Sequence, residues 1–546
     1  MRLALPTMLA AALVLAAGAP LAADDYPRQP GVDVQNYAFH IALSDATDEI
    51  TGSATVDVRF VQAGLTSFWL DLASPSHGKG MTVSAVTSNA APARYTHSED
   101  RLTIQLPRPS GAGQRASFTI QYRGVPAGGL NIGPNRFGER TFFSSNWPDL
   151  AHQWLPCVDH PHDKATSEFF ITAPAAYQVV ANGRLEEDTE LAGGARLTHW
   201  KESVPIATWL DNIGVARFEV RRTGEAASVP LETWVFPQEP RGGAIFDQDT
   251  RLAVEFFSSQ IGPYPYEKLA DVEAVGVDGG MEHASEIFFG QGVLSGRQGL
   301  PFAERGSGAS IVAHETAHQW FGDSVTESDW DDVWLSEGFA TYFALLEVEH
   351  DYGRAAFGSA LARARADLDR AEQREPNITV IATRPWKGVP SSVVYQKGAW
   401  TLHMLRGLMG DAKFWSGIRE YYRRYRDANA STADFQKVME NAAGADLGWF
   451  FDQWLRRRGR PAIQGAWRYD PASREIVIDL MQTQPGAPYR LLIPVAIAPE
   501  SAAPRMERVE MNANRQSFRI PSSASPRDVS LDPDSWVLMN ASFSRQ

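Results

Sequence analysis

The sequence of 546 residues contains a single cysteine, Cys157. An intrachain disulfide is therefore excluded, and stability must come from buried apolar side chains, with any metal site adding to it. Positive charge is also scarce, because the formal net charge is −14 and the most compact basic block is "RRRGR" at residues 456–460. An acidic chain of this kind argues against nucleic acid as a partner.

Long apolar runs are missing after the N-terminus, so no later segment is expected to span a membrane. The N-terminus itself has Arg2, an apolar run and an alanine-rich exit, which predicts a secretory signal peptide over residues 1–23, cleaved after Ala23. The alternative is a membrane anchor, although the apolar core is short for a spanning helix of about 20 residues. A lipid anchor is disfavoured because no cysteine follows. We expect an exported chain, periplasmic or secreted, with no membrane span once the signal is removed.

The length predicts about three or four domains. Hydrophobic residues make up 44% of the chain, including 16 Trp and 27 Phe, which is enough material for packed cores and argues against extended disorder. No internal repeat or long low-complexity linker is visible.

The pattern of apolar residues divides the chain into three regions. Alternation at period two, as in the face formed by Tyr37, Phe39, Ile41 and Leu43, predicts an N-terminal β domain over residues 24–216. Helical spacing begins near Asp249 and dominates residues 217–459, so the middle region is expected to be mainly α. Alternation returns afterwards, and residues 460–546 are enough for one small β domain.

The segment "AHETAHQWFGDSVTESDWDDVWLSEGFA" carries the strongest functional signal. His314 and His318 are four residues apart, so on a helix both imidazoles point from one face and reach one ion. Glu337 follows His318 by 18 residues, and a second helix packed on the first would supply it as a third ligand. Two imidazoles and one carboxylate with an open position are typical of catalytic zinc. Glu315 is placed to take a proton from a water molecule that the ion activates.

The alternative for this segment is an accidental His-Glu-x-x-His string on a solvated helix. By composition such a string arises by chance in roughly one or two per cent of chains of this length. Because Glu337 adds a ligand at a suitable spacing, we predict one catalytic zinc ion held by His314, His318 and Glu337.

His-Glu-x-x-His followed after 18 residues by Glu in "WLSEGFA" resembles the M1 family of zinc aminopeptidases, the gluzincins that include aminopeptidase N and leukotriene A4 hydrolase. Three further segments are similar to motifs of that family and occur in the same order. They are "LPCVDHPHDKAT" (155–166), "IGPYPYEKL" (261–269) and "VVYQKGA" (393–399). The resemblance runs from about residue 37 to residue 460.

This resemblance implies a multidomain α+β fold: an N-terminal β domain, a thermolysin-like α-rich catalytic domain and a small C-terminal β-sandwich domain. It implies a short form of the family without the large C-terminal helical domain, and a more open approach to the site. It also implies an oxyanion-stabilising role for Tyr395. Taken alone, Tyr395 would more simply be a packing residue at the start of a helix.

The stretch "GVDGGMEHASE" (276–286) matches the family's exopeptidase motif through Gly279, Gly280, Met281 and Glu282. By resemblance, Glu282 accepts a hydrogen bond from the free α-ammonium of the substrate, and the two glycines let an extended substrate approach their backbone. The alternative is an ordinary β-turn with a solvated glutamate. The substrates implied are peptides with a free N-terminus.

Two positions depart from the family pattern. His283 stands where Asn is usual, and His152 stands where Arg is usual. These changes bear on specificity and pH optimum, because neither removes a ligand or the base.

Two alternatives to an aminopeptidase are an epoxide hydrolase on the same zinc site and a catalytically inactive binding scaffold. The preferred N-terminal residue of the substrate and the oligomeric state do not follow from the sequence.

Overall fold

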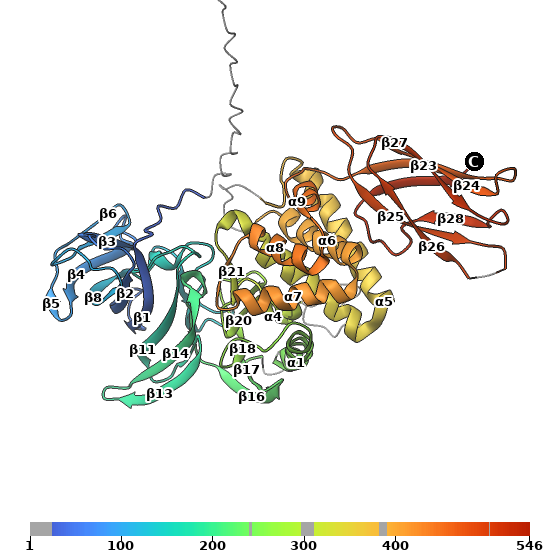
Figure 1. The fold of residues 1–546 in the computed structure, drawn as a ribbon. Helices are drawn as coiled ribbons and strands as arrows, with labels where there is room; N and C mark the ends of the chain where they lie inside the picture. Colours follow the sequence, from blue (N-terminus) through green and yellow to red (C-terminus); the bar gives the residue numbers. More distant parts are fainter. Residues whose placement is uncertain (1–23, 240–242, 296–310, 382–389, 502) are drawn as a thin grey trace, which may run out of the picture.

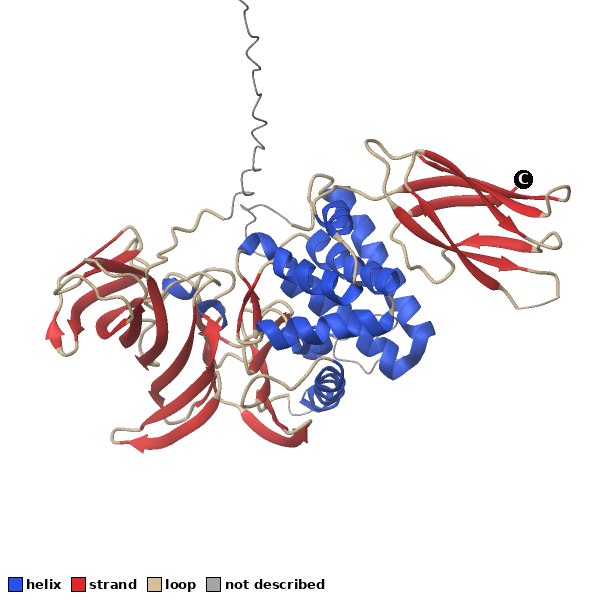
Figure 2. Cartoon of the chain, viewed as in Figure 1, coloured by secondary structure: helices blue, strands red, loops and turns tan. Residues whose placement is uncertain are grey.

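The computed structural model describes residues 24–239, 243–295, 311–381, 390–501 and 503–546. The predicted signal peptide, residues 1–23, lies outside the described residues. Within those ranges, no helix combines the length and apolarity needed to cross a membrane. Figures 1 and 2 show a β region, a central helical region and a second β region arranged side by side in chain order.

The N-terminal region is built on an eight-stranded sheet in which β1 pairs in parallel with β11 and antiparallel with β2. The predicted apolar face of the first strand is confirmed, since Tyr37, Phe39 and Ile41 are buried. In spatial order the strands are β13 (Arg184–Leu191), β14 (Ala195–Ala207), β11 (Lys164–Pro174), β1 (Val32–Ala42), β2 (Ile50–Phe60), β8 (Gln114–Val125), β4 (Gly80–Ser88) and β5 (Ala91–Pro92).

Two smaller sheets complete this region. One has the order β3 (Ser67–Asp71), β7 (Arg101–Gln105) and β6 (Tyr95–Ser98), and the other has the order β12 (Gln178–Ala181), β15 (Ile213–Ala216), β10 (Arg140–Ser144) and β9 (Leu130–Pro134). Short 3-10 helices lie at Ala151–Gln153 (η1) and Thr208–Leu210 (η2).

A five-stranded sheet lies beside the central helices. Its order is β16 (Glu219–Ala226), β17 (Val229–Val235), β18 (Leu269–Ala274), β20 (Glu286–Gly290) and β19 (Gly280–Met281). Strands β17, β18 and β20 are parallel, whereas the two-residue strand β19 pairs antiparallel with β20 at the edge. All residues of β18 and β20 are buried, as expected for parallel strands covered on both faces.

The described helices are α1 (Gly243–Gln260), α2 (Gln291–Ser295), α4 (Ile311–His318), α5 (Trp334–Arg374), α6 (Ser392–Met409), α7 (Asp411–Tyr425), α8 (Thr432–Ala443) and α9 (Gly448–Leu455). A short parallel pair, β21 (Val325–Glu327) with β22 (Ala428–Ala430), and the 3-10 helix η4 (Trp330–Asp332) lie between them. Helices α5 and α6 approach closely where Gly338 meets Gly398, since a Cβ on Gly338 would lie 3.0 Å from the Gly398 Cα. This contact lies next to Glu337 and close to Tyr395.

The C-terminal strands form two sheets. The four-stranded sheet has the order β27 (Arg515–Pro521), β24 (Glu475–Gln482), β23 (Ala462–Asp470) and β29 (Asn540–Arg545), and the three-stranded sheet has the order β26 (Arg505–Met511), β25 (Leu491–Ala498) and β28 (Asp528–Leu531). This region contacts α6 through Trp536, whose ring stacks on His403 at 4.6 Å.

These elements confirm the predicted fold class, with an N-terminal β region, a central helical region and C-terminal β strands. The exact domain limits at residues 216 and 459 stay predictions.

Candidate metal centre

Two neighbouring helices supply the three predicted metal ligands. His314 and His318 lie one turn apart on α4, and Glu337 lies in the first turn of α5. The Nε2 atoms of the two histidines are 3.2 Å apart. Glu337 Oε2 lies 3.3 Å from His314 Nε2 and 3.4 Å from His318 Nε2. The three ligand atoms therefore form a nearly equilateral triangle.

This triangle fits zinc. Tetrahedral ligands bonded at 2.0–2.1 Å lie roughly 3.3–3.4 Å from one another, which matches the distances between the three atoms. His318 is buried, whereas the His314 side chain keeps 20% of its surface exposed. On the other side of the His318 ring, Nδ1 lies 2.9 Å from Ser336 Oγ, a contact that holds the ring in place. The residues thus suit one ion with a position open for substrate.

Two further carboxylates surround the triangle. Glu282 Oε1 lies 3.9 Å from His318 Nδ1, and ligand atoms of Glu282, Glu315 and His318 lie within 4.8 Å of one another. Burial raises the pKa of Glu282, and burial together with the Glu282 charge raises the pKa of Glu315 well above its usual range. Three acidic groups converge on one buried point, which suits a cationic centre.

Tyr395 lies in the first turn of α6, as expected from the sequence. Its hydroxyl donates a hydrogen bond to Glu337 Oε1 at 2.6 Å, and its ring lies 6.2 Å from that of His314. Burial and the neighbouring Glu337 charge raise the pKa of Tyr395 well above its usual range, so the phenol stays protonated. A neutral O–H donor therefore stands beside the ligand triangle.

The predicted substrate-binding stretch forms the edge strand β19 and the turn after it. Gly280 packs directly against the Glu315 side chain, and a Cβ at this position would overlap Glu315 Cγ and Cδ. At Gly279 the nearest atom to an added Cβ is Ile311 Cδ1 at 3.7 Å. Met281 is buried. The structure thus places Gly280 against Glu315 and gives Gly280 an additional reason to lack a side chain, whereas the substrate-binding role of this stretch stays a prediction.

Gln319, directly after the second histidine, is a residue that the sequence reasoning missed. Its Oε1 accepts hydrogen bonds from the Ser285 N–H and from the Tyr264 hydroxyl, both at 2.9 Å. Its Nε2 donates to the His283 carbonyl at 3.1 Å and to Asp323 Oδ2 at 2.8 Å. The available signal is a polar amide directly before the apolar pair Trp320 and Phe321, because such a group, once buried, needs partners.

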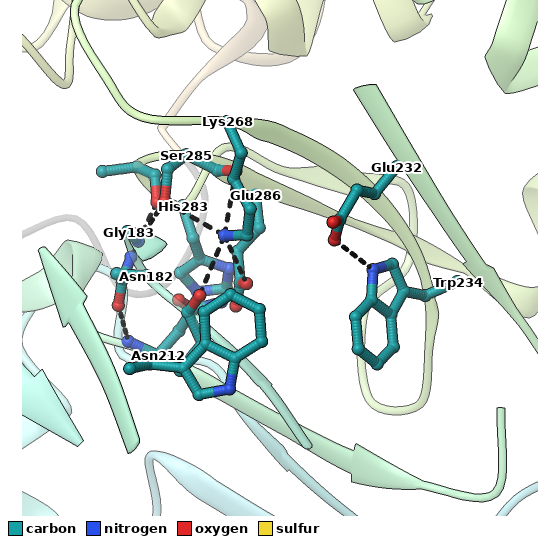
Figure 3. Close-up of polar contacts among 12 residues, drawn as sticks. Asn182, Gly183, Asn212, Glu232, Trp234, Lys268, His283, Ser285 and Glu286 are labelled. Carbon is teal, nitrogen blue, oxygen red and sulfur yellow. Dashed lines mark hydrogen bonds and ion pairs between the residues drawn. The ribbon is translucent and has the colours of Figure 1, made fainter. Parts of the chain in front are cut away.

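The sequence assigns no role to His283. In the structure its side chain is fully buried. The imidazole is buried against Phe288 at 4.8 Å, and neither ring nitrogen has a hydrogen-bond partner among the described residues. Burial lowers the pKa of His283 to about 3, so the ring is neutral. Figure 3 shows it beside the polar cluster in which Lys268 contacts Ser285 and Glu286. His283 is therefore a neutral, buried ring packed against Phe288, directly after Glu282 in the chain.

The second departure, His152, has a charged partner. Its Nδ1 lies 2.6 Å from Asp159 Oδ2, within the "LPCVDHPHDKAT" segment. Burial alone would lower the pKa of His152, but the hydrogen bond and charge of Asp159 outweigh it and raise this pKa to about 9. At neutral pH His152 is thus a cation, as the arginine usual at this position would be.

The fold and the ligand set together define a gluzincin-type metal centre, with two helical histidines and a glutamate from the following helix. Two family models match the chain: the Peptidase M1 N-terminal domain over residues 34–210 and the Peptidase family M1 domain over residues 247–454. The chain belongs to peptidase family M1, a family that implies zinc as its cofactor.

Relatives by sequence are aminopeptidases. A probable aminopeptidase 2 from Sulfurisphaera tokodaii is 28% identical over 57% of this chain and 41% of the relative. A glutamyl aminopeptidase from the snake Bitis rhinoceros is 29% identical over 58% of this chain and 34% of the relative. The chain thus spans about a third to two fifths of the length of these curated relatives.

Solved structures of a relative cover more of the fold. The M1 zinc metallopeptidase from Deinococcus radiodurans is 27% identical, with a TM-score of 0.66 over 79% of this chain and 95% of that chain. A mutant of that protein bound to a Tyr-Ser-Ala substrate matches with a TM-score of 0.67 over 79% of this chain and 96% of that chain.

Proposed function

We propose that this protein is a zinc-dependent aminopeptidase that removes N-terminal residues from peptides. The observation that carries the proposal is the position of Glu282. Its buried carboxylate belongs to a group of ligand atoms from Glu282, Glu315 and His318 that lie within 4.8 Å of one another, so a free α-ammonium paired with it would bring the first peptide bond to the metal centre. The Tyr-Ser-Ala substrate of the Deinococcus relative supports the same class of substrate.

Each site residue has one role in this proposal. His314, His318 and Glu337 would hold one zinc ion, which when bound supplies Lewis acidity for hydrolysis at neutral pH. Glu315 removes a proton from the attacking water and later delivers it to the leaving amine. Tyr395 donates a hydrogen bond to the oxyanion that develops on the substrate carbonyl, for which it exchanges its present partner, Glu337 Oε1.

The β19 segment would select the substrate. Gly279, Gly280 and Met281 line the extended main chain of the peptide, and Glu282 limits cleavage to the first bond. An export route after removal of residues 1–23 forms part of the same proposal, since the N-terminal sequence has the features of a signal peptide. Peptides outside the cytoplasm are then the substrates that the enzyme meets.

A panel of aminoacyl chromogenic substrates, each with a free and an N-acetylated amino group, tests the assignment. We expect chelator-sensitive hydrolysis of the free forms only, and a loss of about 1.5–3 kcal/mol of transition-state stabilisation in Glu282→Ala. Equal rates on free and acetylated substrates would contradict the exopeptidase role. Zinc-loaded protein without any chelator-sensitive hydrolysis would favour the binding scaffold.

A further inference from the structure

The first described residue, Asp24, is tied to the helical region far along the chain. Its main-chain N–H points at both carboxylate oxygens of Asp329, at 3.3 and 3.2 Å. Asp329 directly precedes η4, the 3-10 helix that leads into α5 and thus to Glu337. The N–H that would become the terminal amine after cleavage at Ala23 therefore already has a carboxylate partner.

The side chain of Asp24 is fixed as well. Its carboxylate is fully buried, with Oδ2 2.7 Å from His160 Nε2 and 3.3 Å from the Trp330 N–H. Burial raises the pKa of Asp24, but the hydrogen bonds from His160 and from main-chain N–H groups outweigh it and lower this pKa to about 2. Asp24 is therefore ionised under all physiological conditions, inside a seam between the N-terminal β region and η4.

Asp329 has room for a second cationic partner. Asp24 is already paired with His160, whereas Asp329 faces Arg28, whose Nη2 lies 3.1 Å from Asp329 Oδ2, and the Asp24 N–H. Asp329 keeps only 15% of its side-chain surface exposed, so water screens it poorly. An α-ammonium on Asp24 would give Asp329 a second cationic partner, where an amide N–H gives it only a hydrogen bond.

We infer that Asp329 is a binding site for the α-ammonium of the mature N-terminus, formed when the bond between Ala23 and Asp24 is cleaved. Hydrolysis of that peptide bond frees the amine of Asp24, which takes up a proton at neutral pH. The new ammonium forms an ion pair with Asp329 and clamps the N-terminal β region to the segment before Glu337. This inference rests on the proposed removal of residues 1–23.

Aromatic packing supports the clamp. Trp330 lies between the two regions, with its ring 5.8 Å from Trp147 and 6.1 Å from Trp209. Tyr26 stacks on His160 at 4.6 Å, and its hydroxyl donates to Asp71 Oδ2 at 2.5 Å. The arm that starts at Asp24 is thus held by its side chains as well as by its first main-chain nitrogen.

The test compares two chains made by cleavage of a fusion protein: one that begins at Asp24 and one that retains Ala22 and Ala23. We expect the chain that begins at Asp24 to melt about 1–2 °C higher. In the Asp329→Asn background this difference should vanish. In the control Asp33→Asn, which removes the carboxylate paired with Arg59 elsewhere in the β region, the difference should persist.

Nα-acetylation of the chain that begins at Asp24 gives a second measurement without any side-chain change, and it should remove the same difference even if Asp329→Asn fails to fold. Equal melting temperatures of the two chains, or a difference that survives in Asp329→Asn, would overturn the inference. Sequencing the N-terminus of exported protein should find Asp24, and any other first residue would also overturn it. None of these readouts needs hydrolysis, so they are independent of the aminopeptidase proposal.

Discussion

Gly280 shows how a missing side chain shapes this site. A Cβ there would overlap the Glu315 side chain, whereas a Cβ at Gly279 would meet only Ile311 at 3.7 Å. We expect Gly280→Ala to displace the Glu315 carboxylate and to lower kcat by about 100-fold, because a shift of about 1 Å in a catalytic group has effects of this size. Zinc content should not change, since no ligand is touched. Steady-state kinetics and metal analysis measure both quantities.

Gly279→Ala is the matched control for this substitution. The same methyl group is added one residue away, where it meets no atom of Glu315, so kcat should stay close to that of the unaltered protein, and any effect on the proposed substrate contact should appear in KM. If both variants lost activity equally, the substrate rather than Glu315 would be the neighbour that demands glycine in this stretch.

The ion pair of His152 and Asp159 predicts a pH dependence of stability. The folded-state pKa of His152, about 9, lies above its ordinary value of 6.5. The pair therefore contributes its full stabilisation below pH 6.5 and loses it as pH rises through about 9. Thermal melts of the unaltered protein and of His152→Gln between pH 6 and pH 10 should converge at the alkaline end. Curves that stay parallel over this range would contradict a charged His152.

At the scale of elements, Gln319 joins the metal-binding helix to the turn after β19. Its side chain contacts the main chain of His283 and Ser285 on one side and Asp323 on the other. Gln319→Met keeps the length of the side chain but removes these bonds. We expect KM for free-amino substrates to rise about tenfold while zinc content is unchanged, since one lost positioning interaction of about 1.4 kcal/mol has this effect.

Gln121→Met, which removes an exposed amide that donates to Ser53 Oγ, is the control and should leave KM unchanged. Restored KM in Gln319→Glu would argue for the acceptor contacts to Ser285 and Tyr264, which a carboxylate still provides. A Gln319→Met variant that lost zinc instead would show that Gln319 supports α4 itself and not the turn.

The elements that could be predicted from sequence are those with local signals. His314 and His318 share one face of α4, because spacing along a helix fixes which face a side chain takes. Glu337 lies on the following helix, α5, as the pattern of that segment predicts. The contact of Gly280 with Glu315 and the bonds of Gln319 depend on how β19, α4 and the following turn pack in space. No pattern within one segment encodes such contacts, so they could not be predicted from the sequence.

At the scale of the whole molecule, metal removal should lower stability as well as activity. Without an ion, Glu282, Glu315 and Glu337 would share one buried pocket at the junction of α4, α5 and β19. Zinc at 1,000 times its Kd would add about 4 kcal/mol to the stability of the folded state. We therefore expect chelated protein to melt lower and to recover on addition of zinc. His314→Ala should show little recovery, and an equal zinc effect in both proteins would place the stabilising ion elsewhere.

The contact of Asp24 with Asp329 spans 305 positions of the chain. A contact of such sequence separation forms only after the segments between its ends have been made and folded, because closing so long a loop early gains nothing to offset its entropy. The residues around Asp24, which are synthesised early, are therefore among the last to reach their final place. Folding should accordingly show a late step, in which the N-terminal arm docks onto a helical region that is already assembled.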